Sequence, residues 1–273
     1  KTNVSINSLI KEISLVNKII PSLSPDLLIN CGMKSILLTF IIALFNPNIK
    51  IINSIIGLGN FFHKKFSILK IIVKNFLKIL FKRKNYYFLV ESNNLKKKIS
   101  KFFSIKRNRI YVVGGIGIDT RKFYYTPTKF NKKQKIKFLI ISRLIADKGI
   151  NELYFSIKEL IHTYKNKIHF TIIGDLDEDN PNNIKKEILL FFKKNKMINH
   201  IPSTNKISKY IKDCHILIHP SYHEGLSVVC QEAACCGRGI ITTNIPGCRE
   251  IVRHKVNGLL VESRNKEDLL KKI

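Results

Sequence analysis

The stretch His219-Pro-Ser-Tyr-His-Glu-Gly-Leu-Ser-Val-Val-Cys-Gln-Glu232 decides the fold class of the chain. The apolar segment that ends at His219 predicts a buried strand. The apolar pattern from about Ser227 to residue 236 predicts a helix, which the glycines after it stop. A polar turn containing Glu224 joins the two, and Glu232 lies about two turns further on, within the helix. In parallel α/β sheets, ligands bind at such junctions, at the carboxyl ends of the strands.

The beginning of the predicted helix suits an anion, particularly a diphosphate. The N–H groups of Gly225, Leu226 and Ser227 would lie at its positive end, where the helix dipole favours negative charge. Glu224 before the helix and Glu232 within it could then accept hydroxyl groups on either side of the diphosphate. This outline fits a nucleotide-sugar.

The sequence around this stretch alternates strands and helices from about residue 134 onward. The expected strands are 136–142, 168–174, 215–219, 239–243 and 258–262, and the expected helices are 149–165, 183–195, 205–212, 227–236 and 266 onward. This alternation predicts a doubly wound parallel sheet with Rossmann-like connectivity. We therefore expect a C-terminal Rossmann-like domain over residues 129–273.

Two basic residues follow the first strand of this domain, in the segment Ser142-Arg-Leu-Ile-Ala-Asp-Lys-Gly149. Arg143 and Lys148 would sit at the carboxyl end of the strand, just before a helix. Both side chains could then reach phosphate oxygens in the ligand site. The alternative is an ordinary surface pair.

Residues 1–128 show a second, less complete alternation. The expected helices are 6–20, 34–45 and 95–103, and the expected strands are 26–30, 49–56, 86–90 and a segment from 109. The strand at 26–30 is expected to be buried. The glycines at 57 and 59 predict a tight turn after a strand, and the sequence Thr126-Pro-Thr128 predicts an interdomain linker. We interpret residues 1–128 as an incomplete Rossmann-like domain, and both ends of the chain as truncated.

The chain is strongly basic, with 48 Lys and Arg, 19 Asp and Glu, and a formal charge of +29. Residues 1–128 contribute +18 (22 basic, 4 acidic) and residues 129–273 contribute +11 (26 basic, 15 acidic). Such an excess indicates an anionic partner, either nucleic acid or a membrane surface. The alternative is composition drift, since Ile, Lys and Asn are abundant throughout. A nucleic-acid-binding protein is disfavoured, because the sequence shows no RRM, KH, zinc-finger or helix-turn-helix signature.

Residues 61–84 predict a basic amphipathic helix. The segment carries eight Lys and Arg, and its lysines at 70, 74, 78 and 82 recur every four residues among apolar side chains. Such a helix can lie on anionic lipid headgroups, and each basic residue then contributes about 1 kcal/mol. Alternatively, it is a surface helix that packs its apolar face on the domain, and the two interpretations are compatible.

The cysteines and the apolar runs indicate in which cellular compartment the protein works. The six cysteines have no paired C-x-x-C spacing, which favours reduced thiols in a cytosolic protein over a metal site. No apolar run reaches the roughly 18–20 residues that a membrane span needs. We therefore expect a cytoplasmic protein that binds the membrane peripherally.

Taken together, these segments resemble the retaining glycosyltransferases of family 4, which have the GT-B fold. The resemblance covers nearly the whole chain and rests on residues 142–149, 172–175, 219–233, 244–252 and 257–262. Glu224 and Glu232, separated by seven residues, match the two-glutamate signature of that family. Residues 25–34 and 55–61 resemble the branch that builds bacterial capsular and lipid-linked polysaccharides. The resemblance implies two Rossmann-like domains that face each other across a cleft, the N-terminal one incomplete here.

The resemblance also implies roles for individual residues. Arg143 and Lys148 would hold the donor diphosphate, and Glu224 would bind hydroxyls of the donor sugar, so these three are the expected catalytic residues. Glu232 would bind the ribose. The backbone of Gly225, Leu226 and Ser227 would complete the phosphate site, and Gly174 of the 172–175 motif is counted with the donor-binding residues.

Further implications concern the base and the chemistry. The loop after residues 197–201 would lie near the nucleotide base. No metal or other cofactor is expected, because Arg, Lys and the helix dipole can neutralise the departing diphosphate. His223 is a candidate base beside Glu224, although a role in shaping the loop is the preferred interpretation.

The implied activity is transfer of a sugar, expected from a UDP-sugar, to a hydroxyl of a polyprenyl-linked or glycan acceptor. The anomeric configuration would be retained, and the enzyme would act in cell-surface polysaccharide synthesis at the inner face of a bacterial plasma membrane. Two departures stand against this reading: Asn30 and Cys31 occupy positions where many relatives have histidines, and the N-terminal glycine-rich loop is missing. A truncated, inactive remnant and a sugar-nucleotide epimerase of the same fold are the alternatives.

Overall fold

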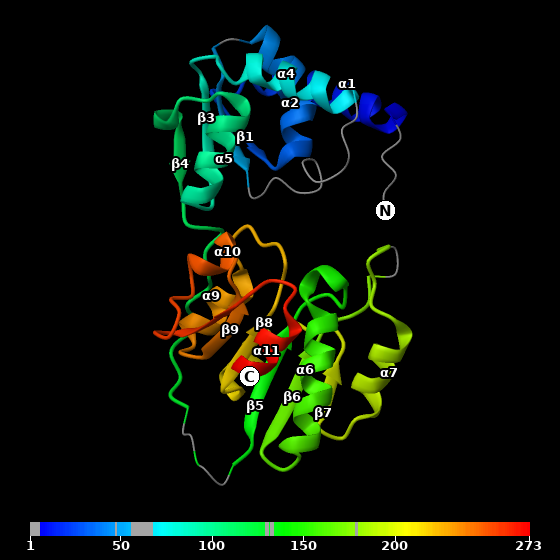
Figure 1. The fold of residues 1–273 in the computed structure, drawn as a ribbon. Helices are drawn as coiled ribbons and strands as arrows, with labels where there is room; N and C mark the ends of the chain where they lie inside the picture. The colour runs from blue at the N-terminus through cyan, green and yellow to red at the C-terminus, as the bar shows by residue number, and fades with distance from the viewer. Residues whose placement is uncertain (1–5, 47, 56–67, 129–130, 132–133, 178–179) are drawn as a thin grey trace. The chain divides into compact units, whose positions relative to one another are not determined.

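A computed structural model describes residues 6–46, 48–55, 68–128, 131, 134–177 and 180–273 (Figure 1). The chain divides into two compact units, residues 1–116 and 117–273. Each unit contains one parallel sheet, in agreement with the expected α/β class. The glycines at 57 and 59 and the first part of the 61–84 segment lie outside the described residues.

The first unit is built on a four-stranded parallel sheet in the order β1-β2-β3-β4. Its strands are β1 (Leu27–Cys31), β2 (Lys50–Ile55), β3 (Tyr86–Val90) and β4 (Ile110–Val112), and its helices are α1 (Ile6–Leu23), α2 (Met33–Phe45), α4 (Ile68–Leu80) and α5 (Asn93–Phe103). Alternate residues of β2 and β3, such as Ile51 and Phe88, are buried. The core forms where they meet apolar residues of α4 and α5, such as Leu77 and Phe103.

The prediction that residues 26–30 form a buried strand is wrong in one respect. Only Asn30 of β1 is buried, and Leu27 and Ile29 are exposed, because β1 lies at the edge of the described sheet. The Asn30 amide donates to Asn53 Oδ1 (2.9 Å), and its own oxygen accepts from the Thr39 hydroxyl (3.1 Å). Asn30 therefore stabilises the interior of the unit.

Helix α4 packs one face and exposes another. Leu77 and Leu80 are buried in the core of the unit, whereas Ile71 and Ile79 are 45% and 71% exposed. Lys74 covers the Phe102 ring, with Nζ 4.0 Å from its centroid. The packing interpretation of the 61–84 helix is thus confirmed for its described part, and an exposed face carrying lysine and isoleucine remains. No helix among the described residues is long and apolar enough to cross a bilayer.

The second unit has a six-stranded parallel sheet in the order β10-β9-β8-β5-β6-β7. Its strands are β5 (Ile136–Ile141), β6 (Ile168–Ile173), β7 (Ile198–Ile201), β8 (Ile216–His219), β9 (Gly239–Thr243) and β10 (Gly258–Val261). Its helices are α6 (Ile150–Thr163), α7 (Lys186–Lys194), α8 (Ile207–Asp213), α9 (Val228–Cys235), α10 (Pro246–Arg249) and α11 (Lys266–Lys272). The sequence had indicated all of these except β7 and α10.

Helices cover both faces of this sheet (Figure 1). Along β5, Phe138 and Ile140 point to a cluster that includes residues of α6, α7 and α11. Leu139, between them, points to the opposite cluster, which α8 and α9 complete. The near-continuous apolar runs of the strands are explained by this burial on both faces.

The linker segment belongs to the second unit, so the division lies before the boundary expected after residue 128. Phe123 is buried against the sheet, and its carbonyl accepts from the Cys235 thiol (2.7 Å). The buried guanidinium of Arg238 donates to three carbonyls, those of Thr126, Cys214 and Cys236. These contacts fasten residues 123–126 to the sheet.

Candidate functional site

The candidate site lies where the strand order of the second sheet reverses. Strand β5 pairs with β6 on one side and with β8 on the other. The chain adds β6 and β7 on the first side and then crosses back to add β8, β9 and β10 on the second. The loops after β5 and β8 therefore diverge to opposite faces of the sheet. A crevice at the carboxyl ends of the strands results, which is the usual ligand site of this architecture.

A cavity of about 420 Å³ occupies this position. It is lined by Ile141, Ser142, Arg143, Lys148, Ile173, Gly174, Ser203, Thr204, Ile207, His219, Glu224, Leu226, Ser227, Val228 and Val229. Six of the eight predicted site residues are in this lining: Arg143, Lys148, Gly174, Glu224, Leu226 and Ser227. Gly225 and Glu232 are not.

Two glycines let the loops approach closely enough to form the cavity. Gly149 has φ +71°, and a Cβ there would lie 2.1 Å from the Pro220 carbonyl oxygen. Gly174 has φ +148°, and its Cβ would lie 1.9 Å from the Ser142 carbonyl oxygen. A side chain at either position would force the loop after β5 away from its neighbour. Gly174 therefore shapes the cavity that it lines.

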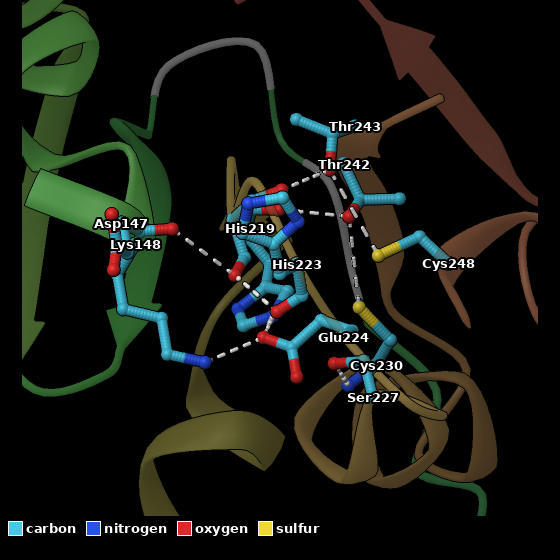
Figure 2. Close-up of polar contacts among 11 residues, drawn as sticks. Asp147, Lys148, His219, His223, Glu224, Ser227, Cys230, Thr242, Thr243 and Cys248 are labelled. Carbon is cyan, nitrogen blue, oxygen red and sulfur yellow. Dashed lines mark hydrogen bonds and ion pairs between the residues drawn. The ribbon is translucent and has the colours of Figure 1, made fainter. Parts of the chain in front are cut away.

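Lys148 and Glu224 meet across the cavity (Figure 2). Lys148 ends a short 3-10 turn (residues 146–148) after β5, and its Nζ lies 2.6 Å from Glu224 Oε1. His219, the last residue of β8, places Nε2 2.9 Å from the same oxygen. Burial raises the pKa of Glu224, but the His219 hydrogen bond and the charges of His219 and Lys148 outweigh burial and lower the pKa to about 2. Glu224 is therefore an anion at neutral pH.

Arg143 reaches the cavity from the same loop but has a different partner. Its Nη1 lies 2.5 Å from Asp177 Oδ2, and the Arg143 side chain is 62% exposed. The hydrogen bond from Asn180, followed by the contact with Arg143, lowers the pKa of Asp177. Each predicted phosphate-binding cation is thus paired with a carboxylate in this structure. Nothing in the sequence pattern indicated the Asp177 contact.

The beginning of α9 faces the cavity, as expected. Ser227 caps the helix, its hydroxyl accepting from Cys230 N (3.4 Å). The expectation that the Ser227 N–H points to a phosphate is not met here, because that N–H donates to the Gly247 carbonyl (3.3 Å) in α10. The α10 turn, which the sequence analysis had missed, is the reason for this difference.

Glu232 lies further along α9, outside the cavity lining. It follows Val228 by one turn on the same face of the helix, and Val228 does line the cavity. Burial raises the pKa of Glu232 to about 7. Its expected contact with a ribose stays a prediction.

The Glu224 loop is fixed by the elements around it (Figure 2). The Thr242 hydroxyl of β9 donates to the His219 carbonyl (2.7 Å), and the Thr243 hydroxyl donates to the Ser221 carbonyl. On the other side, the Tyr222 hydroxyl donates to the Glu152 carboxylate (2.7 Å) on α6. Main chain and side chains on both sides of the loop thus hold Glu224 in place.

The loop after β7, which the family resemblance implies lies near the nucleotide base, also lines the cavity. Ser203 and Thr204 line it, and the Ser203 N–H donates to Asp175 Oδ2 (3.0 Å). In the described parts of the chain, no three His, Cys, Asp or Glu side chains gather in a way that could hold a metal ion.

His219 is the functional candidate that the sequence analysis overlooked. The histidine it had considered, His223, is exposed, whereas His219 is 4% exposed and contacts Glu224 directly. A histidine that ends an otherwise apolar strand was the available signal, because burying an imidazole is costly without a hydrogen-bond partner.

Comparisons with known proteins find similarity to glycosyl transferases. The sequence model of the family described as glycosyl transferases group 1 matches residues 125–273, more than half of the chain. The chain is 28% identical over 230 residues to the N,N'-diacetylbacillosaminyl-diphospho-undecaprenol α-1,3-N-acetylgalactosaminyltransferase of Campylobacter jejuni, covering 80% of this chain and 58% of that enzyme. It is 29% identical over 191 residues to the capsular polysaccharide biosynthesis glycosyltransferase CapM of Staphylococcus aureus, covering 67% and 50%. The chain thus spans between half and three fifths of the length of these relatives.

Solved structures show the same fold. HepE of Anabaena, crystallised with UDP-glucose, superposes with a TM-score of 0.73 at 16% identity, covering 97% of this chain and 70% of that one. A glycosyltransferase of Rickettsia africae gives a TM-score of 0.75 at 21% identity, covering 100% and 72%. At these identities the likeness concerns the fold, and it confirms the expected GT-B class.

Proposed function

Because the chain belongs to the group 1 glycosyl transferase family, we propose that it transfers a sugar from a nucleotide-sugar to a hydroxyl group of a lipid-linked or polysaccharide acceptor. The observation that carries this proposal is the cluster of Lys148, Glu224 and His219. It lies at the carboxyl ends of β5 and β8, where the strand order of the second sheet reverses. The cluster places a cation and a half-buried carboxylate within one cavity, and these are the groups that a diphosphate and a sugar need.

The cations act on the leaving group. As the bond between the anomeric carbon and the diphosphate breaks, negative charge grows on the diphosphate oxygens. Lys148, Arg143 and the N-terminus of α9 lie around the cavity and stabilise that charge without a metal ion. The acceptor oxygen forms its bond to the anomeric carbon on the face that the diphosphate leaves, which retains the configuration. The departing diphosphate takes the acceptor proton.

Glu224 acts on the sugar. Its low pKa keeps it ionised, so it accepts hydrogen bonds from donor-sugar hydroxyls throughout the neutral range. Glu232 takes the ribose hydroxyls one turn along α9, and the loop at Ser203 and Thr204 contacts the base. UDP is the proposed nucleotide, supported by the UDP-glucose bound to HepE, which shares this fold.

The acceptor is proposed to be lipid-linked or capsular. The support is the name of the Campylobacter jejuni relative, which describes a diphospho-undecaprenol acceptor, and the capsular role of the Staphylococcus aureus relative. We place the reaction at the inner face of a bacterial plasma membrane, with α4 and its basic surroundings in contact with anionic lipid.

The proposal is tested by screening nucleotide-sugars for thermal stabilisation of the full chain. A true donor at 100 times its dissociation constant stabilises the protein by about 2.7 kcal/mol. The best donor is then used in transfer assays with the Lys148→Ala and Glu224→Ala variants, each expected to lower turnover about 100-fold or more.

Lys158→Ala is the matched control for Lys148→Ala, because Lys158 is exposed on α6, away from the cavity lining. Near-normal transfer by both site variants would refute the residue assignment. A folded protein that no nucleotide-sugar stabilises would refute the proposed function itself.

A further inference from the structure

His219 is a buried histidine in a position that otherwise favours apolar residues. It ends β8, whose residues Leu217 and Ile218 are fully buried, and it is itself 4% exposed. The Thr242 hydroxyl holds its carbonyl at 2.7 Å, which fixes the main chain from which the imidazole projects. The only hydrogen bond of its ring among the described residues joins Nε2 to Glu224 Oε1 at 2.9 Å.

Lys148 and His219 bind the same oxygen of Glu224 (Figure 2). Oε1 therefore receives both contacts, and within the described chain no hydrogen bond reaches Oε2. A carboxylate has about four acceptor positions on its two oxygens, so Oε2 keeps its capacity for hydroxyl donors.

The two partners of Oε1 differ in how they respond to a ligand. Lys148 carries its ammonium on a long, flexible side chain, and a diphosphate in the cavity competes for that ammonium. His219 is short, buried and anchored through its own main chain, so it keeps its place when the ammonium moves. After the diphosphate binds, His219 is the contact that still orients the carboxylate.

We propose that His219 is a positioning residue for Glu224: its Nε2–H holds Oε1, so that Oε2 is presented to a hydroxyl of the donor sugar once the diphosphate engages Lys148. This inference rests on the proposed function, because it assumes a nucleotide-sugar in the cavity. In this role His219 carries a proton on Nε2 and does not transfer a proton itself.

The experiment compares two ligands, UDP and the UDP-sugar that best stabilises the wild-type chain, by titration calorimetry. The ratio of their dissociation constants isolates the part of binding that depends on the sugar. In His219→Leu the dissociation constant of the UDP-sugar divided by that of UDP should rise about 10-fold or more. The affinity for UDP alone should stay within about twofold of the wild-type value. A merely structural role would weaken both ligands equally and would overturn the inference.

Two polar variants keep the test decisive if His219→Leu folds poorly. His219→Gln carries an N–H donor at about the distance of Nε2 and should restore most of the sugar-dependent affinity. His219→Asn, whose shorter side chain cannot reach Glu224 in the same way, should not. Equal behaviour of the Gln and Asn variants would contradict a role for the Nε2–H. His162→Leu, on the exposed face of α6, serves as the control and should leave both affinities unchanged.

A double variant shows whether His219 works through Glu224. In a Glu224→Ala background, adding His219→Leu should leave the ratio unchanged, because the carboxylate to be oriented is gone. A further loss in that background would overturn the inference, yet leave the proposed function intact. Absence of UDP-sugar binding by the wild-type chain would instead overturn the proposed function and, with it, this inference.

Discussion

Glu224 and Glu232, only eight positions apart, have opposite electrostatic environments. Glu224 has two cationic or hydrogen-bonding partners, and its pKa lies near 2. Burial acts on Glu232 without such compensation and raises its pKa to about 7. Two carboxyl groups whose environments separate their pKa values in this way are typical of sites where they serve different purposes.

The raised pKa of Glu232 predicts a pH-dependent effect on stability. A carboxyl group whose folded-state pKa is raised favours folding when protonated, and this contribution is lost as the pH rises from its ordinary pKa to about 7. Glu232→Gln, which resembles the protonated form, should therefore raise the unfolding free energy at pH 8 and leave it unchanged at pH 4. Because the side chain is only partly buried, we expect a gain of about 1 kcal/mol.

Urea denaturation at the two pH values measures this difference. Glu159→Gln is the control, since Glu159 is exposed on α6, and it should have no such pH dependence. An identical effect of Glu232→Gln at pH 4 and pH 8 would contradict the unfavourable burial of its charge.

Helix α4 combines a packed face with an exposed one. Ile79 is 71% exposed at its end, and Lys82 and Lys84 follow it on the surface. Exposed apolar side chains beside lysines are the combination that binds anionic lipid surfaces. Unit 1, residues 1–116, carries 20 basic and 3 acidic residues, so the field around the helix has the same sign.

Replacing Lys78, Lys82 and Lys84 together with Gln should weaken binding to vesicles rich in phosphatidylglycerol. At about 1 kcal/mol for each basic residue, the loss is about 100-fold in the partition coefficient. Flotation of the full chain with such vesicles measures it. The matched control replaces Lys158, Lys193 and Lys194 on α6 and α7, which removes the same charge from the second unit. If both triple variants lose binding equally, total charge and not α4 is responsible.

The linker decides where the second unit begins. Phe123 is buried against the sheet, and Thr126 supplies one of the three carbonyls that bind Arg238. Without these residues the sheet would expose an apolar site and leave a buried guanidinium short of an acceptor. The unit should therefore need residues 117–128 to reach full stability.

A comparison of fragments 117–273 and 129–273 tests this expectation. The shorter fragment should be less stable by about 3 kcal/mol, the typical cost of removing a buried phenylalanine. Phe123→Ala in the full chain should reproduce most of that loss. Equal urea midpoints for the two fragments would show that the linker contributes nothing to the second unit.

The sequence predicted the parts of the site that depend on local pattern. Apolar runs revealed the strands, and Arg143, Lys148 and Glu224 were recognisable because each follows the carboxyl end of a strand. The contacts that could not be predicted join loops far apart in sequence. The Ser227 N–H meets Gly247 through the α10 turn, and Arg143 meets Asp177 across two different loops. Such pairings depend on how loops pack in three dimensions, which periodicity does not encode.

The pairing of Lys148 with Glu224 and of Arg143 with Asp177 has a consequence for how the site responds to ionic strength. A donor diphosphate entering the cavity exchanges one set of charge contacts for another, and does not meet bare cations. Dissolved salt screens the contacts of the empty and of the occupied site alike, so the two effects largely cancel. The affinity for the donor should accordingly vary less between dilute and concentrated electrolyte than the strongly positive charge of the chain would suggest.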